Sequence, residues 1–324
     1  MIEKTARHLA DSKSILIVSH ANPDGDAVSS LLALGLGLEK LNKKVVLYNE
    51  SLIPAVYRFL PSVDRISQDL TTEMQFDTVI VLDCGDLERI GDVVQTVLAE
   101  QVVINIDHHV TNTGFGDIQF VDPEACATAE LIHRLLKHLS VPIDTAIATA
   151  IYTGILTDTG SFRFSNTNLS TFAICTEMVE KGVRPFDVAQ CVYGTYSLGR
   201  IKLLNLALDS IEISSNGKLS IMTITQEMLN MTRTQLDDAD GLIHYARRIE
   251  DVKVAALIQE LCNGQKPSDN QHRFHVSLRS DGTVDVASIA TAYGGGGHSN
   301  AAGFGIDAKL SEVKSKIVIL AEKL

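Results

Sequence analysis

Short apolar segments alternate with amphipathic ones along the first half of the chain. Four of the apolar segments are rich in β-branched residues, which is typical of strands buried on both faces of a parallel sheet. They are Ser14–Ser19, Lys44–Leu47, Thr78–Leu82 and Val102–Ile106. Three longer segments carry apolar residues at helical spacing, namely Ala27–Leu41, Ala127–Leu139 and Thr145–Leu156. This repeated strand–helix order predicts an α/β fold with a doubly wound, mainly parallel sheet in the first domain.

The second half predicts a smaller α/β domain. Tyr196–Ile211 has the pattern of a connecting helix, and Asn216-Gly217 predicts a hairpin turn after it. The strands expected beyond that turn are Leu219–Ile224, Val254–Gln259, His272–Arg279 and Thr283–Val286. The predicted organisation is a first domain at 1–190, a linker helix at 191–215 and a second domain at 216–324.

Composition narrows the class of protein. The chain of 324 residues has 28 basic and 40 acidic side chains, a net charge of −12, which argues against binding to duplex DNA through a basic face. The segment Ala146–Leu156 is too short to span a bilayer, and the N-terminal residues lack the apolar core of a signal peptide. Five scattered cysteines without a CxxC pair suit a reducing compartment. We therefore expect a soluble, cytoplasmic protein without a membrane partner.

Acidic and histidine residues follow three of the four strands predicted in the first domain. Because sites in open α/β sheets form at the carboxyl ends of strands, these residues should converge. A single aspartate after a strand is usually a turn or helix-capping residue, but the joint pattern favours a site. The residues concerned are His20, Asp24 and Asp26 after the first strand, Asp83 after the third, and Asp107, His108 and His109 after the fourth; Asp158, after a helix, is expected at the same crevice.

The charge of this constellation indicates what occupies it. Four aspartates in one crevice, Asp24, Asp26, Asp83 and Asp158, would repel one another without compensation, and two divalent cations cancel four charges. Imidazole and carboxylate ligands without thiolate favour Mn²⁺, with Mg²⁺, Co²⁺, Fe²⁺ and Zn²⁺ as alternatives. Two such ions can activate a hydroxide and stabilise a phosphoryl group during in-line attack. The chemistry expected is hydrolysis of a phosphate ester.

At these residues the chain resembles the DHH phosphoesterase family over nearly its whole length. The segments that carry the resemblance are SHANPDGDAVSS, VLDCGD, NIDHHVTN and GILTDTGSFRFSN in the first domain, and GGGGHSNAAGF in the second. The last is similar to the glycine-rich signature of the DHH-associated C-terminal domain. Within the family, the pattern is similar to the short two-domain nanoRNase and pAp phosphatase group. This resemblance implies a catalytic first domain, a substrate-binding second domain and an active-site cleft between them.

The resemblance also implies a role for each residue of the constellation. One metal ion would be held by His20 and Asp24, the other by Asp26, His108 and Asp158, with Asp83 bridging the two. His109 would approach the substrate phosphate or the leaving oxygen, so that His109 and Asp83 are the residues closest to catalysis. Asp107 would orient a neighbouring ligand, and Ser30 would lie beneath the metal-binding loop.

In the second domain the resemblance implies a site for a substrate phosphate. The residues expected there are Arg279, Ser280, Gly295, Gly296, Gly297 and His298. Glycines allow backbone N–H groups to approach an anion, and Asn300-Ala301-Ala302-Gly303 is expected to open a helix whose N-terminus favours phosphate. A flexible loop is the simpler alternative. His275 would either stack on a base or serve the structure alone.

The function expected is Mn²⁺-dependent hydrolysis of oligonucleotides of two to five residues and of pAp-like nucleoside phosphates. A soluble phosphodiesterase of cyclic dinucleotides, or of linear ones such as pGpG and pApA, is the alternative with the same chemistry. A non-catalytic nucleotide-binding protein is the alternative from another class, and it would be expected to have lost metal ligands. A homodimer remains one option for the assembly.

Overall fold

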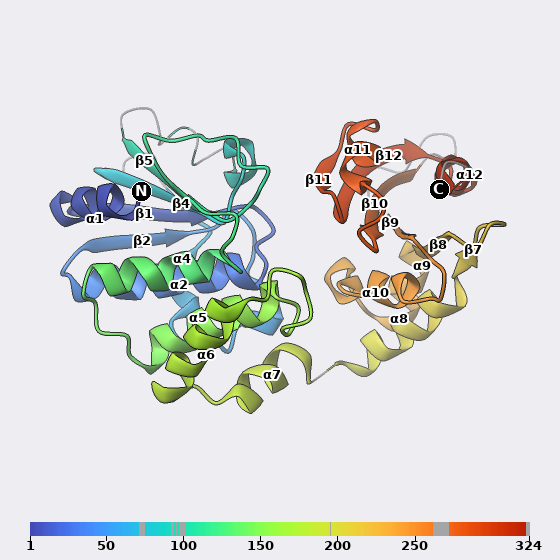
Figure 1. The fold of residues 1–324 in the computed structure, drawn as a ribbon. Helices are drawn as coiled ribbons and strands as arrows, with labels where there is room; N and C mark the ends of the chain where they lie inside the picture. The colour runs from blue at the N-terminus through green and yellow to red at the C-terminus, as the bar shows by residue number, and fades with distance from the viewer. Residues whose placement is uncertain are drawn as a thin grey trace. The chain divides into compact units, whose positions relative to one another are not determined.

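The computed structural model describes residues 1–70, 75–91, 94, 96, 101–194, 196–261 and 272–321, with the side chains of His298, Leu320 and Ala321 outside the description. The chain divides into two units, Met1–Thr195 and Tyr196–Leu324 (Figure 1). Each unit has its own sheet and its own buried core.

The first unit is built on a six-stranded parallel sheet. Its strands are β1 (Ser14–Ser19), β2 (Lys44–Tyr48), β3 (Ile66–Ser67), β4 (Thr78–Leu82), β5 (Val102–Asp107) and β6 (Ile118–Val121). Their order across the sheet is β3-β2-β1-β4-β5-β6, and every neighbouring pair is parallel. This is the strand order of doubly wound sheets, in which the direction of winding reverses between the first strand and the fourth. The predicted α/β fold class is confirmed.

Helices cover this sheet in successive layers. They are α1 (Ile2–Asp11), α2 (Gly25–Lys40), α4 (Thr128–His138), α5 (Thr145–Asp158), α6 (Leu169–Glu180) and α7 (Pro185–Tyr193), with short 3-10 helices η1 (Ala55–Tyr57), η2 (Val63–Arg65) and η3 (Leu87–Ile90). Figure 1 shows α2 and α4 beside the sheet and α5 and α6 beyond them.

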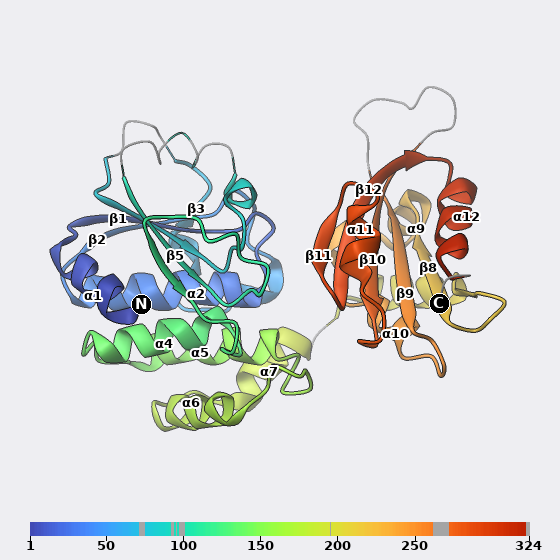
Figure 2. The same ribbon diagram turned by 45° about the horizontal axis from the view of Figure 1, so that its top comes forward.

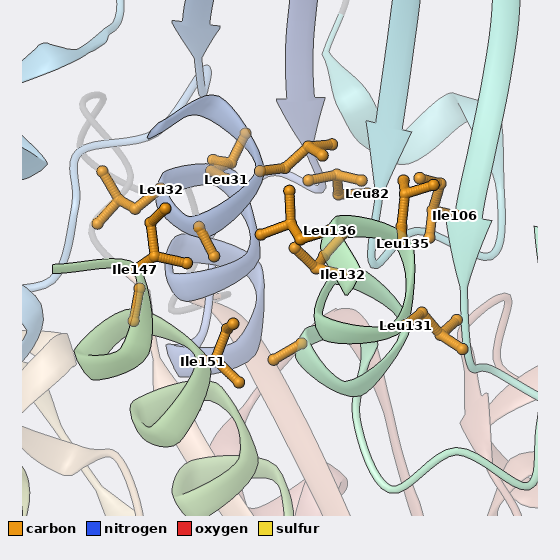
Figure 3. Close-up of a cluster of buried hydrophobic side chains, with 14 of the residues drawn as sticks. Leu31, Leu32, Leu82, Ile106, Leu131, Ile132, Leu135, Leu136, Ile147 and Ile151 are labelled. Carbon is orange, nitrogen blue, oxygen red and sulfur yellow. The ribbon is translucent and has the colours of Figure 1, made fainter. Parts of the chain in front are cut away.

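Buried aliphatic side chains hold these layers together. Figure 3 shows Leu31 of α2 and Leu135 of α4 close to Leu82 and Ile106 at the ends of two strands, with Ile151 of α5 on the outer side. Helix α2 lies between the sheet and α5, and nearly all of its residues are buried. A helix that is apolar on every side belongs in such a central layer, which explains why its sequence lacks a charged face.

The second unit has a six-stranded mixed sheet. Its strands are β7 (Glu212–Ile213), β8 (Leu219–Ile224), β9 (Val254–Glu260), β10 (His272–Ser280), β11 (Gly296–His298) and β12 (Ala301–Ala308), in the order β11-β12-β10-β9-β8-β7. Only β8 and β9 pair in parallel. Its helices are α8 (Leu198–Asp209), α9 (Gln226–Thr232), η5 (Leu236–Ala239), α10 (Ile243–Arg247), α11 (Val286–Thr291) and α12 (Leu310–Ala321).

The two faces of this second sheet carry separate cores. Residues of β8–β10 and β12 pack with α11 and α12 on one face, and residues of β8 and β9 pack with α8, α9 and α10 on the other (Figure 2). Leu203 and Ala207 of α8 are buried in the second of these cores. The segment predicted as a connecting helix is therefore an integral part of the second unit.

Two secondary-structure predictions in this unit were wrong. Thr283–Val286 is no strand, because the Asp285 side chain caps the N-terminus of α11, which begins at Val286. Asn300–Gly303 opens no helix, because Ala301 begins β12, which pairs with both β10 and β11. Small residues at alternate positions of β12 weakened its strand pattern. The hairpin at Asn216-Gly217 is confirmed by the antiparallel pairing of β7 with β8.

The cysteines and the helices of the described residues can be compared with what the sequence predicted. Three of the described cysteines are buried and Cys191 is exposed, and none of the described ones forms a disulfide, while Cys262 lies outside the described residues. Within the described parts of the chain, no helix combines the length and the apolar character that crossing a membrane requires.

Candidate metal centre

The carboxyl ends of β1, β4 and β5 bring together the histidines and aspartates that follow them. Asp83, directly after β4, lies at the centre of this group and is buried. His20 Nε2 is 3.7 Å from Asp83 Oδ2, and His108 Nε2 is 3.8 Å from Asp83 Oδ1. These residues meet beside the reversal of winding between β1 and β4, where doubly wound folds place their ligands. The predicted convergence is what the structure shows.

The N-terminus of α2 contributes two further carboxylates in different environments. Asp24 caps the helix, because its Oδ1 accepts hydrogen bonds from the backbone N–H groups of Asp26 and Ala27 at 3.1 and 3.0 Å, and its side chain is largely exposed. Asp26 is buried, and its two oxygens accept from the backbone N–H groups of Thr128 and Ala129 at 2.6 and 2.9 Å. Carboxylates at helix N-termini are stabilised by the helix dipole. The N-termini of α2 and α4 therefore favour the negative charge of Asp24 and Asp26.

Three groups of side chains could each hold a metal ion. Within each group the donor atoms lie within 4.8 Å of one another. The groups are His20–Asp24–Asp83, Asp26–His108–Asp158 and Asp83–His108–His109. The first two contain the residues that the family resemblance implies for the two metal ions, and Asp83 lies next to both. The third adds His109 as a possible donor, but its Nδ1 donates a hydrogen bond to Asp107 at 2.6 Å.

Backbone carbonyls orient two of the imidazoles. His20 Nδ1 donates to the carbonyl of Ala21 at 2.9 Å, and His108 Nδ1 donates to that of Ala125 at 3.3 Å. The tautomer with a proton on Nδ1 leaves Nε2 as the lone-pair donor, and Nε2 is the atom that faces the carboxylates. Ligating histidines are usually held in this way by an acceptor behind the ring.

Buried negative charge at this centre is balanced only in part, by the neighbouring histidines. Burial and the neighbouring charges of Asp83 and Asp158 raise the pKa of Asp26 well above its ordinary value. Burial and the charge of Asp24 likewise raise the pKa of Asp83, and burial is the main cause that raises the pKa of Asp158 to about 7. In the described parts of the chain, no lysine or arginine forms an ion pair with these carboxylates. Oxygen and imidazole donors around charge that is balanced only in part fit divalent cations.

A chain of hydrogen bonds positions His109. Its Nδ1 donates to Asp107 Oδ1, and the other oxygen of Asp107 accepts from Asn112 Nδ2 at 2.6 Å. Asn112 also donates to Asn105 Oδ1 at 2.8 Å, and Asn105 and Asp107 are fully buried. Burial lowers the pKa of His109, but the hydrogen bond to Asp107 and the charge of Asp83 outweigh it and raise that pKa to about 9. In the metal-free protein, the protonated form of His109 is therefore favoured at neutral pH.

Several supporting residues were not predicted. Thr128 Oγ1 donates to Asp83 Oδ1 at 2.9 Å, and Asn166 Nδ2 donates to Asp158 Oδ2 at 3.0 Å. Asn112 and Asn166 lie inside the motifs NIDHHVTN and GILTDTGSFRFSN, so their positions were visible, but their partners depend on the tertiary fold. Ser30, which was predicted beneath the metal loop, donates to Asp26 Oδ1 at 3.2 Å and is buried.

In the second unit, the residues expected to bind phosphate lie on β10, on β11 and just before it. Arg279 is mostly buried, and its Nη1 donates to the carbonyl of Leu278 at 2.9 Å. Ser280 is buried and serves the following turn, because its Oγ accepts from the N–H groups of Gly282 and Val284 at 3.0 and 3.3 Å. Neighbouring positions of a strand face opposite sides of the sheet, so the side chains of Arg279 and Ser280 are on different faces.

The glycine run follows the edge of the sheet. A Cβ at Gly295 would lie 2.1 Å from the carbonyl oxygen of Gly303, and one at Gly297 would lie 2.5 Å from that of Ala301. These glycines allow the backbone to pass close to β12, with Gly296 and His298 paired to it as β11. The side chain of His298 lies outside the described part of the structure.

The fold and this arrangement of ligands define the class of the protein. The chain belongs to the DHH family: the N-terminal domain of that family matches residues 14–155, and a DHHA1 domain matches residues 222–323. The resemblance noted in the sequence is confirmed.

Individual relatives extend this assignment over most of the chain. The protein is similar to the bifunctional oligoribonuclease and PAP phosphatase NrnA of Thermus thermophilus, with 33% identity over 289 residues that cover 89% of this chain and 83% of the relative. The protein of the same name from Bacillus subtilis is 28% identical over 296 residues, 90% of this chain and 89% of its own. The crystal structure of an exopolyphosphatase-related protein from Bacteroides fragilis, 28% identical, has a TM-score of 0.91 and covers 99% of this chain and 95% of its own.

Proposed function

We propose that this protein is a metal-dependent phosphoesterase that hydrolyses oligonucleotides of two to five residues and pAp-like nucleoside phosphates. The observation that carries the proposal is the pair of three-residue donor groups, His20–Asp24–Asp83 and Asp26–His108–Asp158, in a buried and negatively charged setting. The names of the relatives from Thermus thermophilus and Bacillus subtilis point to the same substrates. The cytoplasmic location expected from the sequence is part of the proposal.

Two Mn²⁺ ions per chain are the cofactor in this proposal, with Mg²⁺ or Co²⁺ as alternatives. One ion would be held by His20, Asp24 and Asp83, and the other by Asp26, His108 and Asp158 together with Asp83. When bound, such ions supply charge stabilisation at the phosphoryl oxygens and a more acidic water. Two features indicate that these residues suit divalent cations. The donors are carboxylate oxygens and imidazole nitrogens, and burial raises the pKa values of the carboxylates, so a bound cation would stabilise their charged form.

His109 contributes the proton chemistry in this mechanism. In the metal-free protein its pKa is about 9, and the hydrogen bond to Asp107, one of the causes of that rise, favours the protonated imidazole. A protonated imidazole can donate a hydrogen bond to a phosphate oxygen and then a proton to the leaving oxygen. Asp107 holds the ring through Nδ1 and thereby directs the opposite nitrogen away from itself. Arg279 would bind a second phosphate of the substrate, because guanidinium groups pair with phosphate through two parallel hydrogen bonds.

A panel of substrates tests the proposal. With Mn²⁺ present, we expect turnover of pAp, pApA and a five-residue RNA, and much slower turnover of a twenty-residue RNA. pGpG and cyclic dinucleotides in the same competition assay separate the main proposal from its alternative. EDTA should abolish hydrolysis, and Mn²⁺ should restore it better than Ca²⁺, which prefers six to eight oxygen ligands at longer distances.

Variants connect the activity to the described site. Asp83→Asn keeps the shape of the residue but removes the charge between both donor groups, so it should abolish activity on every substrate. Asp307→Asn on β12 in the second unit is the matched control and should be as active as wild type. Turnover that persists in chelator, or in Asp83→Asn, would refute the metal-dependent mechanism. A preference for the twenty-residue RNA would refute the substrate class.

A further inference from the structure

Arg279 shares one face of the second sheet with α10. Arg279 pairs across the strands with Ala255 of β9, and Ser277 pairs with Leu257. Ala255 and Leu257 belong to the core under α8, α9 and α10. Directly paired residues of neighbouring strands lie on the same face, so Arg279 faces the side on which α10 packs. This helix contacts β8, β9 and β10, and it is buried through Ile243 and Ala246.

Two side chains of α10 lie in the electrostatic environment of Arg279. Burial and then the charges of Arg279 and Arg247 lower the pKa of His244. Burial also lowers the pKa of Arg279, the charge of Asp240 opposes that shift, and the charge of Arg247 adds to it. Both His244 and Arg247 are half-buried. The packing of α10 on β9 and β10, together with these charge effects, places Arg247 and His244 near Arg279.

These arginines are not neutralised by the protein. In the described parts of the chain, neither Arg247 nor Arg279 forms an ion pair with a carboxylate. The charge of Asp240 acts on Arg279 without forming an ion pair with it. The backbone carbonyl of Asp240 accepts a hydrogen bond from Arg200 Nη2 at 2.6 Å. The segment 216–324 has 12 basic and 13 acidic residues, so this is a local concentration of positive charge. Half-buried like charges that Asp240 compensates only in part are unfavourable, and an anion relieves the repulsion.

The neighbouring strand presents small residues on this face. Ala301 and Gly303 pair with Arg279 and Ser277 and lie on the same side of the sheet. Because Gly303 has no side chain, the ring of His275 can lie over it, and a Cβ there would be 3.1 Å from His275 Nε2. Burial and the charge of Arg279 lower the pKa of His275. A neutral ring on a face of small residues is a suitable neighbour for a nucleoside.

We propose that Arg247 and Arg279 together form a phosphate-binding pair that holds a non-reacting phosphate of a nucleotide substrate. Two guanidinium groups can share the oxygens of one doubly charged phosphate, each through a bidentate contact. His244 adds a neutral hydrogen-bonding group beside the pair. The identity of the ligand as a nucleotide rests on the proposed function, whereas the assignment of Arg247 rests on the position and charge of α10.

Direct binding of pAp tests the pair. We would titrate pAp into the full-length, Mn²⁺-loaded chain by calorimetry, in a His109→Ala background that slows turnover. Removal of one charged hydrogen-bonding partner should weaken binding about 10- to 100-fold in Arg247→Ala. Arg247→Lys should recover part of that loss, because it keeps the charge without the bidentate geometry. Arg248→Ala is the matched control, an equal change of charge one residue away on an exposed side chain, and it should stay within about twofold of the background.

Salt dependence separates a phosphate contact from a structural effect. Loss of one phosphate contact should make the Kd for pAp less dependent on salt in Arg247→Ala than in the background, whereas a misfolded variant would lose binding at every salt concentration. An affinity of Arg247→Ala within twofold of the background, or an equal loss in Arg248→Ala, would overturn the proposal. If wild type hydrolyses no short oligonucleotide but pAp binding still depends on Arg247, the proposed function fails and the phosphate-binding pair stands.

Discussion

Gly154 in α5 lies where three helices converge on the candidate metal centre, so Gly154→Ala is a sharp test of the packing around it. A Cβ at this position would lie 2.7 Å from the Cβ of Ala129, 2.8 Å from Asp26 Oδ1 and 3.2 Å from the Cβ of Ser29. The first and third of these atoms are attached directly to helix backbones. The second, Asp26 Oδ1, accepts from the Ala129 N–H and from Ser30 Oγ, while the other oxygen of the same carboxylate accepts from the Thr128 N–H. None of the three can move away as the flexible end of a side chain would.

Two opposing contributions set the size of the effect. Alanine is favoured over glycine inside a helix by about 1 kcal/mol, and overpacking a filled core costs about 1–3 kcal/mol. Because no neighbour of Gly154 can yield easily, we expect a net loss of about 1–2 kcal/mol. That loss corresponds to a decrease of about 2–8 °C in Tm for a unit of this size. Displacement of Asp26 should also weaken metal binding about 10- to 100-fold, the usual cost of disturbing the support of a ligand.

The assay compares Gly154→Ala with Gly35→Ala by thermal unfolding and metal titration. Gly35 is also buried in a helix, but its added Cβ would meet the terminal Cδ2 of Leu47 at 2.6 Å, at the far end of a side chain that can change rotamer. Gly35→Ala should therefore retain metal affinity and lose little stability. Equal stability and equal metal affinity of the two variants would show that the close approach of α5 to Asp26 does not constrain the metal centre.

Three further predictions concern the same centre. Asn112→Asp keeps the shape of the side chain but places a carboxylate beside Asp107, so kcat should fall about 10- to 100-fold with metal content unchanged; loss of metal instead would contradict the positioning role. His108→Ala should lose metal by elemental analysis, whereas His109→Ala should retain it and lose about 10²–10⁴-fold in kcat; equal metal loss in both would show the roles to be misassigned. The Tm of the metal-free protein should fall between pH 7 and 9, because folding raises the pKa of Asp158 from 3.8 to about 7 and that of His109 from 6.5 to about 9, so the folded state retains protons that the unfolded state releases. Buried histidines with lowered pKa values act in the opposite direction only below about pH 6.5. A Tm that rises with pH between 7 and 9 in chelator would contradict those shifts.

Much of the first unit could be predicted because its strands are buried on both faces. Such strands are continuous apolar segments, and the predicted bounds Ser14–Ser19 and Thr78–Leu82 are those of β1 and β4. The residue after each strand then lies at the carboxyl edge of the sheet. That rule brought His20 and Asp83 together before any tertiary contact was known, and the structure places them 3.7 Å apart.

The features that sequence reasoning missed depend on contacts between distant segments. Ala301–Ala308 carries glycine and alanine at several positions of its strand, so its pattern of burial is visible only once β10 and β11 lie beside it. Thr128 is an ordinary first-turn residue in the sequence, and its role appears only where α4 meets Asp83. In the sequence, Arg247 is one of several charged residues without a recognisable role. It comes near Arg279 only because α10 packs on β10.

Helix N-termini stabilise part of the negative charge at the metal centre, but they do not neutralise that charge. Two helix N-termini point at the site, since Asp24 caps α2 and Asp26 accepts from the first turn of α4. A helix dipole contributes about 0.3–1 kcal/mol to a nearby carboxylate, and up to about 2 kcal/mol in partly buried geometries. The rise in the pKa of Asp158 from 3.8 to about 7 corresponds to roughly 4 kcal/mol against ionisation. Asp158 is the last residue of α5, so no dipole of its own helix favours its charge. At neutral pH the metal-free centre therefore keeps part of its protons, and bound cations would favour full ionisation. Metal affinity should consequently rise with pH over the same range in which the metal-free protein loses stability, because the ions replace the protons that the buried carboxylates would otherwise keep.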